Sequence, residues 1–148
     1  MKRQIKRIRD AYNLTLDQFH KGIDPFDLLP VEFRSSPEFK KLIEDNTGHC
    51  SSGAQDIRDF LGPEKGMKYL DLGCAANLAV YRLDEWGALY YGVDISDKLI
   101  DEMKMFVLKN GIEVGGIFNC EINKLPFTND FFDIGTVIGV FEYCSLDY

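Results

Sequence analysis

Hydrophobic residues follow two different periods along the second part of the chain. Short, nearly continuous apolar runs alternate with stretches in which apolar residues recur every three or four positions. The runs predict four strands, at 68–72, 89–93, 117–122 and 134–140. The spaced stretches predict three helices, at 54–61, 78–85 and 98–109. Strands that are apolar on both faces and separated by helices are typical of a parallel sheet covered by helices on both sides, so the pattern predicts an α/β fold.

The first fifty residues lack this alternation. A helix over 1–19 is predicted by apolar residues at near-helical spacing, Ile5, Ile8, Tyr12 and Phe19. Gly22 ends it, and Pro25, Pro30 and Pro37 predict an irregular connection over 23–38. We therefore expect a helical cap at 1–50 and a sheet-forming domain at 51–148.

Two short helices are predicted on either side of this boundary. Ser36 and Pro37 have the residue types of an N-cap and a first helical position, which predicts a helix over 38–44. A polar loop follows at 46–53. In the helix at 54–61 we expect three apolar side chains to face the core, those of Ile57, Phe60 and Leu61.

Composition narrows the class of protein. The chain has 148 residues, of which 45% are apolar, enough for one domain with a buried core. Its net charge of −7 disfavours binding to nucleic acid, although the first ten residues hold five basic groups against one acid. The absence of a bilayer-length apolar run or a signal-peptide core predicts a cytoplasmic protein that does not bind membranes. The spacing of the four cysteines, Cys50, Cys74, Cys120 and Cys144, predicts reduced thiols and no metal site.

Candidate chemistry lies where the strands end, because ligands of open parallel sheets collect at the carboxyl ends. After the first strand come Asp71, Gly73 and small residues, which let a ligand approach backbone amides at a helix start or serve tight packing. The second strand ends in Asp94, 21 residues beyond Gly73, where a carboxylate can accept hydrogen bonds from a ribose diol or simply begin a helix. Ser96 is expected to cap that helix.

The third and fourth strands add further candidates. Glu121 follows the third strand, either as an acceptor for the amine of an adenine, with the Ile122 amide at a ring nitrogen, or as a solvated loop acid. Phe131 and Phe132 precede Asp133, which is expected to seat the fourth strand.

Together these segments resemble the class I S-adenosylmethionine-dependent methyltransferases, in particular the small-molecule branch with the ubiquinone/menaquinone-biosynthesis-like domain. The resemblance begins near Gly53. It is carried by the segments 68–74, 92–96, 125–127 with 132–133, and 140–143. It implies a Rossmann-like doubly wound, mostly parallel sheet with the order third, second, first, fourth, and S-adenosylmethionine as cofactor. The cofactor-binding residues that it implies are Asp71, Gly73, Cys74, Ala75, Asp94, Ile95, Glu121, Ile122 and Ile138.

Within this resemblance, Asp71 and Gly73 lie near the methionine half of the cofactor, Asp94 binds the ribose and Ile95 contacts the adenine. Ile138 lies beside the sulfonium. Two departures stand in the turn, where the family has glycines at the positions of Ala75 and Asn77. A left-handed torsion at Ala75 costs about 1 kcal/mol or more.

Methyl transfer from a sulfonium depends mainly on alignment, so no catalytic residue is assigned. His20 and His49 are candidate bases because histidine titrates near neutrality. Tyr12, Phe19 and Tyr143 are candidates for an acceptor pocket for a small molecule, with packing in a core as the alternative.

Members of the resembled family have more strands than the four found here. We therefore expect either that the chain is the amino-terminal part of a longer enzyme, or that the edge of the fourth strand pairs with a second copy or a partner.

Three functions follow from the sequence. The first is methylation of a small molecule, and the second is a non-catalytic, partner-dependent module that binds S-adenosylmethionine. A nicotinamide-dependent oxidoreductase is disfavoured, because Gly73 does not begin the glycine spacing that seats a pyrophosphate.

Overall fold

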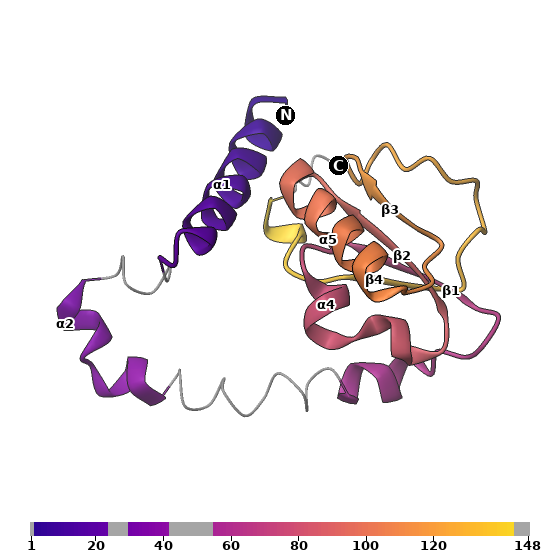
Figure 1. The fold of residues 1–148 in the computed structure, drawn as a ribbon, viewed down its shortest axis with the longest axis horizontal. Coiled ribbons are helices and arrows are strands. Elements are labelled where there is room, and N and C mark those ends of the chain that lie inside the picture. Colours follow the sequence, from indigo (N-terminus) through magenta and orange to yellow (C-terminus); the bar gives the residue numbers. More distant parts are fainter. Residues whose placement is uncertain (1, 24–29, 42–54, 144–148) are drawn as a thin grey trace.

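The computed structural model describes residues 2–23, 30–41 and 55–143. Its centre is a parallel sheet of four strands in the order β3-β2-β1-β4 (Figure 1). The strands are β1 (Lys68–Leu72), β2 (Leu89–Asp94), β3 (Gly116–Asn119) and β4 (Ile134–Val137). The Rossmann-like α/β fold and the strand order expected from the sequence are confirmed. The order reverses between β1 and β4, and the crevice beyond their carboxyl ends is where such sheets bind ligands.

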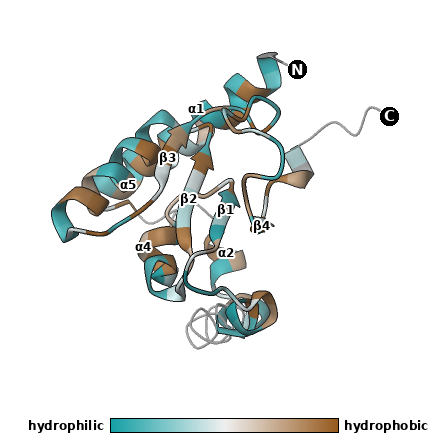
Figure 2. Ribbon diagram, turned by 90° about the vertical axis from the view of Figure 1, so that its right-hand side faces the viewer, coloured by the Kyte–Doolittle hydropathy of each residue, from teal (hydrophilic) through white to brown (hydrophobic). Residues whose placement is uncertain are grey.

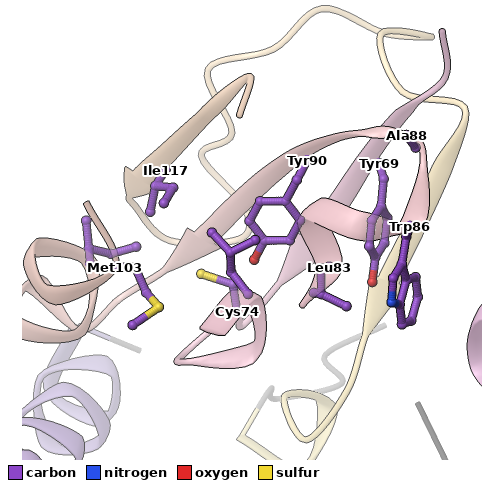
Figure 3. Packing of buried hydrophobic residues seen from close by; sticks show 10 residues of the cluster. Tyr69, Cys74, Leu83, Trp86, Ala88, Tyr90, Met103 and Ile117 are labelled. Atoms are coloured by element: carbon purple, nitrogen blue, oxygen red, sulfur yellow. The ribbon is translucent and has the colours of Figure 1, made fainter. Parts of the chain in front are cut away.

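One face of the sheet packs against helices. Its buried cluster consists of Tyr69, Cys74, Leu78, Leu83, Trp86, Ala88, Tyr90, Ile100, Met103 and Ile117 (Figure 3). The ring of Tyr69 is parallel to that of Trp86 and nearly perpendicular to that of Tyr90, with centroids 5.9 Å apart in both pairs. Aromatic side chains therefore supply much of this core.

The opposite face is covered differently. Val93 and Tyr91 are buried there against aromatic residues of the connection between β3 and β4, namely Phe127, Phe131 and Phe132. Within the described residues, helices pack on the first face and this connection packs on the second. The sequence-based expectation of helices on both sides is thus met on one face.

The helix after β1 is shorter than predicted. α4 (Asn77–Tyr81) ends at Arg82, whose φ is 51°, and a 3₁₀ turn, η2 (Leu83–Trp86), follows. Residues three positions apart lie on the same side of a 3₁₀ turn, and Leu83 and Trp86 are both buried in the core.

The helix after β2 agrees with its prediction. α5 (Asp97–Asn110) begins with Ser96, whose hydroxyl accepts a hydrogen bond from the Leu99 amide, and ends at Gly111, whose φ is 62°. Ser96 is therefore confirmed as the N-cap. Asp133 also has its expected role, because its carboxylate accepts a 2.7 Å hydrogen bond from the Lys68 amide at the start of β1.

The two last strands are shorter than predicted. β3 ends at Asn119, and a turn closed by the bond from the Lys124 amide to the Glu121 carbonyl follows. β4 ends at Val137, and the chain bends at Gly139, whose φ is 67°, into the 3₁₀ turn η3 (Phe141–Tyr143). Both predicted strands therefore included loop residues that begin the candidate site.

The N-terminal helix α1 (Lys2–His20) confirms the prediction for 1–19, and it packs against α5 (Figure 1). The predicted irregular connection over 23–38 was wrong for part of its length, because α2 (Val31–Arg34) forms there. Pro30 precedes this helix with φ of −53°, and its carbonyl accepts the first helical hydrogen bond, from Arg34. The proline thus starts a helix instead of preventing one.

The structure describes parts of the two short helices that were predicted at 38–44 and 54–61. Residues 37–41 are helical, and the Ser36 hydroxyl accepts a hydrogen bond from the Phe39 amide, as predicted. Residues 55–61 are also helical, but Phe60 is 88% exposed and Ile57 is exposed too, so two of the three expected core contacts were wrong. Only Leu61 packs against the core. The predicted loop at 46–53 lies outside the described residues.

None of the helices in the described part of the chain combines the length and apolar composition needed to cross a bilayer.

Candidate functional site

The turn between β1 and α4 is held by β2. The amides of Gly73 and Cys74 both donate to the carbonyl of Val93, at 2.8 and 3.0 Å. Gly73 has φ of 76° and Ala75 has φ of 37°, so the left-handed torsion anticipated at Ala75 is present. Since these amides are bonded within the chain, a ligand at the turn meets side chains and carbonyls rather than free N–H groups of Gly73 and Cys74.

Asp94 joins the turn to the end of β2. One carboxylate oxygen accepts a hydrogen bond from the Ala75 amide at 3.0 Å, and the other accepts one from the Ser96 amide at 2.8 Å. The side chain is half-buried, and its position is thereby fixed by two backbone groups. A carboxylate has about four acceptor positions, so each oxygen retains one for a ligand.

Asp71 lies beneath the turn and is 1% exposed. Its carboxylate accepts hydrogen bonds from Asn77 at 3.1 Å, Tyr90 at 3.1 Å and Thr136 at 3.2 Å, and the hydroxyl of Tyr69 bonds to that of Thr136 at 2.8 Å. This cluster, the Asp71 network, joins β1, β2, β4 and α4.

The Asp71 network shifts the proton affinities of its members. Burial raises the pKa of Asp71, while its three hydrogen bonds lower it, and the nearby charge of Asp94 adds to the increase. Burial also raises the pKa of Tyr69 to about 12, and it raises the pKa values of Tyr90 and of Cys74, whose thiol is buried beside the network. The tyrosines therefore stay protonated and act as hydrogen-bond donors at neutral pH.

The end of β3 lies beside Asp94. The Asn119 side chain and the Cys120 amide both donate to the Asp94 carbonyl, at 3.0 and 3.1 Å. Glu121 is half-buried and pairs with the exposed Lys124 at 2.6 Å. Ile122 follows in the same turn, and burial raises the pKa of the Cys120 thiol.

The segment after β4 covers the glycine turn. A Cβ atom placed on Gly73 would lie 2.1 Å from a methyl carbon of Val140 and 3.9 Å from the Ile138 carbonyl oxygen. Glycine is therefore required at 73 by the chain's own packing. The side chain of Ile138 is 54% exposed.

Helix α1 lies over the carboxyl edge of the sheet (Figure 2). Asn13 accepts a 2.7 Å hydrogen bond from the Ser96 hydroxyl and donates one of 2.7 Å to Asp97. Nearer its start, α1 bonds to the turn after β4, through Gln4 to the Tyr143 carbonyl at 3.0 Å.

A pocket of about 280 Å³ lies between α1 and η3, lined by Gln4, Arg7, Ile8, Ala11, Tyr12 and Tyr143. Two of the three predicted acceptor-pocket residues, Tyr12 and Tyr143, thus meet here. The third, Phe19, is 70% exposed and contacts His20 instead.

The structure places one of the two candidate bases. His20 lies at the other end of α1 from the pocket, where it pairs with Glu102 of α5. It is not brought together with the glycine turn. His49, like Cys50 and Cys144, lies outside the described residues, whereas Cys74 and Cys120 are free thiols.

Several residues of the site were not among the binding residues predicted from the sequence. These are Asn13, Asn77, Tyr90, Thr136 and Val140. Each comes from a different element or loop, and each has an ordinary alternative role in a helix or strand. Only their tertiary placement identifies them, although a buried aspartate at a strand end signals that donors must surround it.

Comparison with known proteins identifies the class. The sequence profile of the family described as "Methyltransferase domain" matches residues 70–147. The chain belongs to this family, the class I S-adenosylmethionine-dependent methyltransferases, and the cofactor of the class is S-adenosylmethionine. A search of the curated proteins finds no match.

Solved structures share the fold. Magnesium protoporphyrin IX methyltransferase (ChlM) from Synechocystis PCC 6803 with bound SAH is 20% identical, with a TM-score of 0.59, over 89% of this chain and 57% of that one. A SAM-dependent methyltransferase from Thiobacillus denitrificans is 18% identical, with a TM-score of 0.50, over 62% and 38%. The [4+2]-cyclase SpnF is 17% identical, with a TM-score of 0.51, over 57% and 32%. The chain thus spans between about a third and three fifths of the length of these proteins.

Proposed function

We propose that this protein transfers a methyl group from S-adenosylmethionine to a small-molecule acceptor. The observation that carries the proposal is the Asp94 carboxylate, fixed by the amides of Ala75 and Ser96 at the carboxyl edge of the sheet. A fixed carboxylate with one free acceptor position on each oxygen suits the two adjacent hydroxyls of a ribose.

The charge of the site favours a sulfonium cofactor over a dinucleotide. Two carboxylates, those of Asp71 and Asp94, lie close enough for the charge of one to raise the pKa of the other. Negative groups at the turn attract the sulfonium and ammonium groups of S-adenosylmethionine, and they repel a pyrophosphate.

The remaining cofactor contacts follow the order of the strands. We propose that Ile95 and Ile122 contact the adenine, that Glu121 binds its amine, and that Ile138 lies beside the sulfonium. Gly73, Cys74 and Ala75 form the turn that faces the methionine part, with Asp71 supporting it from below. Glu121 keeps a second carboxylate oxygen beyond the one that is paired with Lys124.

Bound S-adenosylmethionine supplies an activated methyl group, which passes to a nucleophilic atom of the acceptor while the sulfur keeps the electron pair of the broken bond. The protein's own contribution is alignment of the two reactants and exclusion of water. The pocket beside Tyr12 and Tyr143 is the proposed acceptor site, because η3 connects it directly to the segment that carries Ile138.

We further propose that residues 1–50 form a lid over the cofactor site. A second proposal is that the protein is cytoplasmic, as its free thiols indicate. The bonds of Asn13 to Ser96 and Asp97 support the first proposal, since they place α1 next to Asp94. The unpaired state of Cys74 and Cys120 supports the second, because reduced thiols are usual in the cytosol.

Calorimetric titration tests the cofactor proposal. We expect S-adenosylmethionine and S-adenosylhomocysteine to bind and NAD not to bind. Binding also stabilises the folded chain: a ligand at a concentration of about 100 times its dissociation constant adds about 2.7 kcal/mol to the free energy of unfolding. Replacement of Asp94 by Ala should weaken binding at least about tenfold, because it removes hydrogen bonds to a charged group.

Two further variants control this experiment. Asp94→Asn keeps the size of the side chain, and Asp101→Asn changes an exposed aspartate on α5. We expect Asp94→Asn to lose affinity and Asp101→Asn to keep it. Equal affinity of all variants for S-adenosylhomocysteine would refute the role of Asp94, and absence of binding to the unmutated chain would refute the methyltransferase proposal.

One observation favours a second function, a non-catalytic module that holds the cofactor. Val140 packs against Gly73, and Ala75 has a strained torsion, so the turn is filled by the chain itself. Release of S-adenosylhomocysteine during incubation with a panel of acceptors separates the two functions, because only the enzyme forms it above the background rate.

A further inference from the structure

We infer that the pocket between α1 and η3 binds a small planar molecule that carries a carboxylate, and that Arg7 is the residue that selects it. The inference names the acceptor class of the proposed methyltransferase and, in that respect, rests on the proposed function. The binding of a planar acid to this pocket is a separate property, which is testable without the cofactor.

The charge of the pocket comes from Arg7. Within the described part of the chain, this guanidinium forms no ion pair, whereas Arg9 pairs with Asp10. The chain carries a net charge of −7, yet five of its first ten residues are basic, so α1 is the element that attracts an anion. The planar fork of an arginine binds both oxygens of a carboxylate at once.

The shape of the pocket comes from two tyrosines. The rings of Tyr12 and Tyr143 have centroids 6.3 Å apart and are inclined at 83°, and their hydroxyls are 3.4 Å apart. Perpendicular rings form a corner in which a third ring can lie flat on one and meet the edge of the other. Ile8 and Ala11 supply apolar wall, and Gln4 holds Tyr143 in place through its carbonyl.

The volume limits the ligand to a small molecule. At about 280 Å³ the pocket is just below the usual range for ligand sites, about 300–1,000 Å³. One or two fused rings with a carboxylate suit this space. An acid of this kind would lie with its charge at Arg7 and its ring in the corner that Tyr12 and Tyr143 form.

The test uses 2-naphthoate as the probe, with 2-naphthamide as a neutral analogue and cyclohexanecarboxylate as a non-planar acid. Binding to the full chain is measured by NMR titration, with and without saturating S-adenosylhomocysteine. We expect 2-naphthoate to bind at least about tenfold more tightly than either analogue, because a hydrogen bond to a charged group and ring stacking both contribute.

Variants assign the selectivity to Arg7. Arg7→Ala should weaken 2-naphthoate binding about tenfold to a hundredfold, and Arg7→Lys should restore part of the affinity because it keeps the charge without the fork. Lys6→Ala is the matched control, since Lys6 is an exposed base one position away that does not line the pocket. Its affinity should stay within about twofold of the unmutated chain.

Three outcomes would overturn the inference: no binding of 2-naphthoate to the unmutated chain, equal binding of the acid and the amide, or equal losses in Arg7→Ala and Lys6→Ala. The affinity for S-adenosylhomocysteine is measured on the same samples. A chain that binds this nucleoside but not the planar acid retains the proposed function and loses the acceptor class. A chain that binds the acid alone loses the proposed function.

Discussion

The buried Asp71 carboxylate makes stability depend on pH in a direction opposite to that of most carboxylates. Burial raises its pKa above the ordinary value of 3.8, so the folded chain binds this proton more tightly than the unfolded chain does. Its contribution to the free energy of unfolding is therefore largest below pH 3.8 and falls as the pH rises through the folded-state pKa.

Asp71→Asn should remove this dependence. An asparagine amide can donate to the Thr136 hydroxyl, which then donates to Tyr69, so both hydrogen bonds remain with their directions reversed. In urea titrations between pH 4 and 8, the stability of Asp71→Asn relative to the unmutated chain should increase with pH. Asp101→Asn should show no such trend, and a constant difference for Asp71→Asn would contradict the raised pKa.

Two adjacent tyrosines allow a matched test of the network. Tyr90→Phe removes a donor from the buried Asp71, which leaves an acceptor oxygen under-satisfied and should cost about 1–3 kcal/mol. Tyr91→Phe removes the hydroxyl of a ring that packs among phenylalanines on the other face of the sheet, and it should cost less than 1 kcal/mol. Chemical denaturation at pH 7 measures both, and equal costs would contradict the role assigned to Tyr90.

The residues at strand ends differ in how well the sequence predicted them. Asp94, Ser96 and Asp133 each lie directly at an element boundary, where a short polar side chain has few alternative roles. The partners of Asp71 lie inside elements. Their hydroxyl and amide groups bond to Asp71 only when β1, β2 and β4 come together. Local patterns do not contain this information.

At the scale of elements, the attachment of α1 to α5 can be tested directly, because a few side-chain bonds join the two helices. Asn13 makes two hydrogen bonds to the start of α5, and Lys98 pairs with Asp17, which lowers the pKa of that carboxyl. Asn13→Ala should speed hydrogen exchange of the α1 amides about fivefold or more, because two bonds of about 0.5–1.5 kcal/mol each are lost.

The control for this prediction is Asn110→Ala, which removes a side-chain bond at the far end of α5 without touching α1. If α1 is a lid, S-adenosylhomocysteine should slow exchange in residues 2–20 of the unmutated chain and do so less in Asn13→Ala. Unchanged exchange on addition of a nucleoside that binds would contradict the lid.

The bounds of an element were predicted well where the sequence marks both of its ends with a capping or terminating residue. They were predicted poorly where one end has no such residue. α5 has a serine cap and a terminal glycine, and its bounds agree with the pattern to within one residue. β3 and β4 were predicted two to three residues too long, because apolar residues such as Ile122 and Ile138 continue past the last paired position. In both cases the excess residues belong to the candidate site, where the chain turns away from the sheet.

At the scale of the whole molecule, the edge of β4 is the feature that bears on assembly. Within the described residues, β4 pairs with β1 alone, and apolar side chains follow it, with Ile138 and Phe141 54% and 63% exposed. An uncharged edge with unpaired backbone groups is a template for another strand. We therefore predict that the chain pairs with a second copy through β4 at tens of micromolar concentration.

The backbone amides of β4 point alternately toward β1 and toward the open edge. Proline substitutions can therefore test pairing with a second copy separately from the stability of the sheet. The Asp133 amide donates to the Lys68 carbonyl of β1, and amides alternate along a strand, so that of Ile134 faces the open edge and that of Gly135 faces β1. Ile134→Pro should give a folded monomer in sedimentation velocity, since edge strands tolerate proline. Gly135→Pro should lower stability instead, because it breaks the sheet itself, and a monomeric unmutated chain would remove the case for self-association.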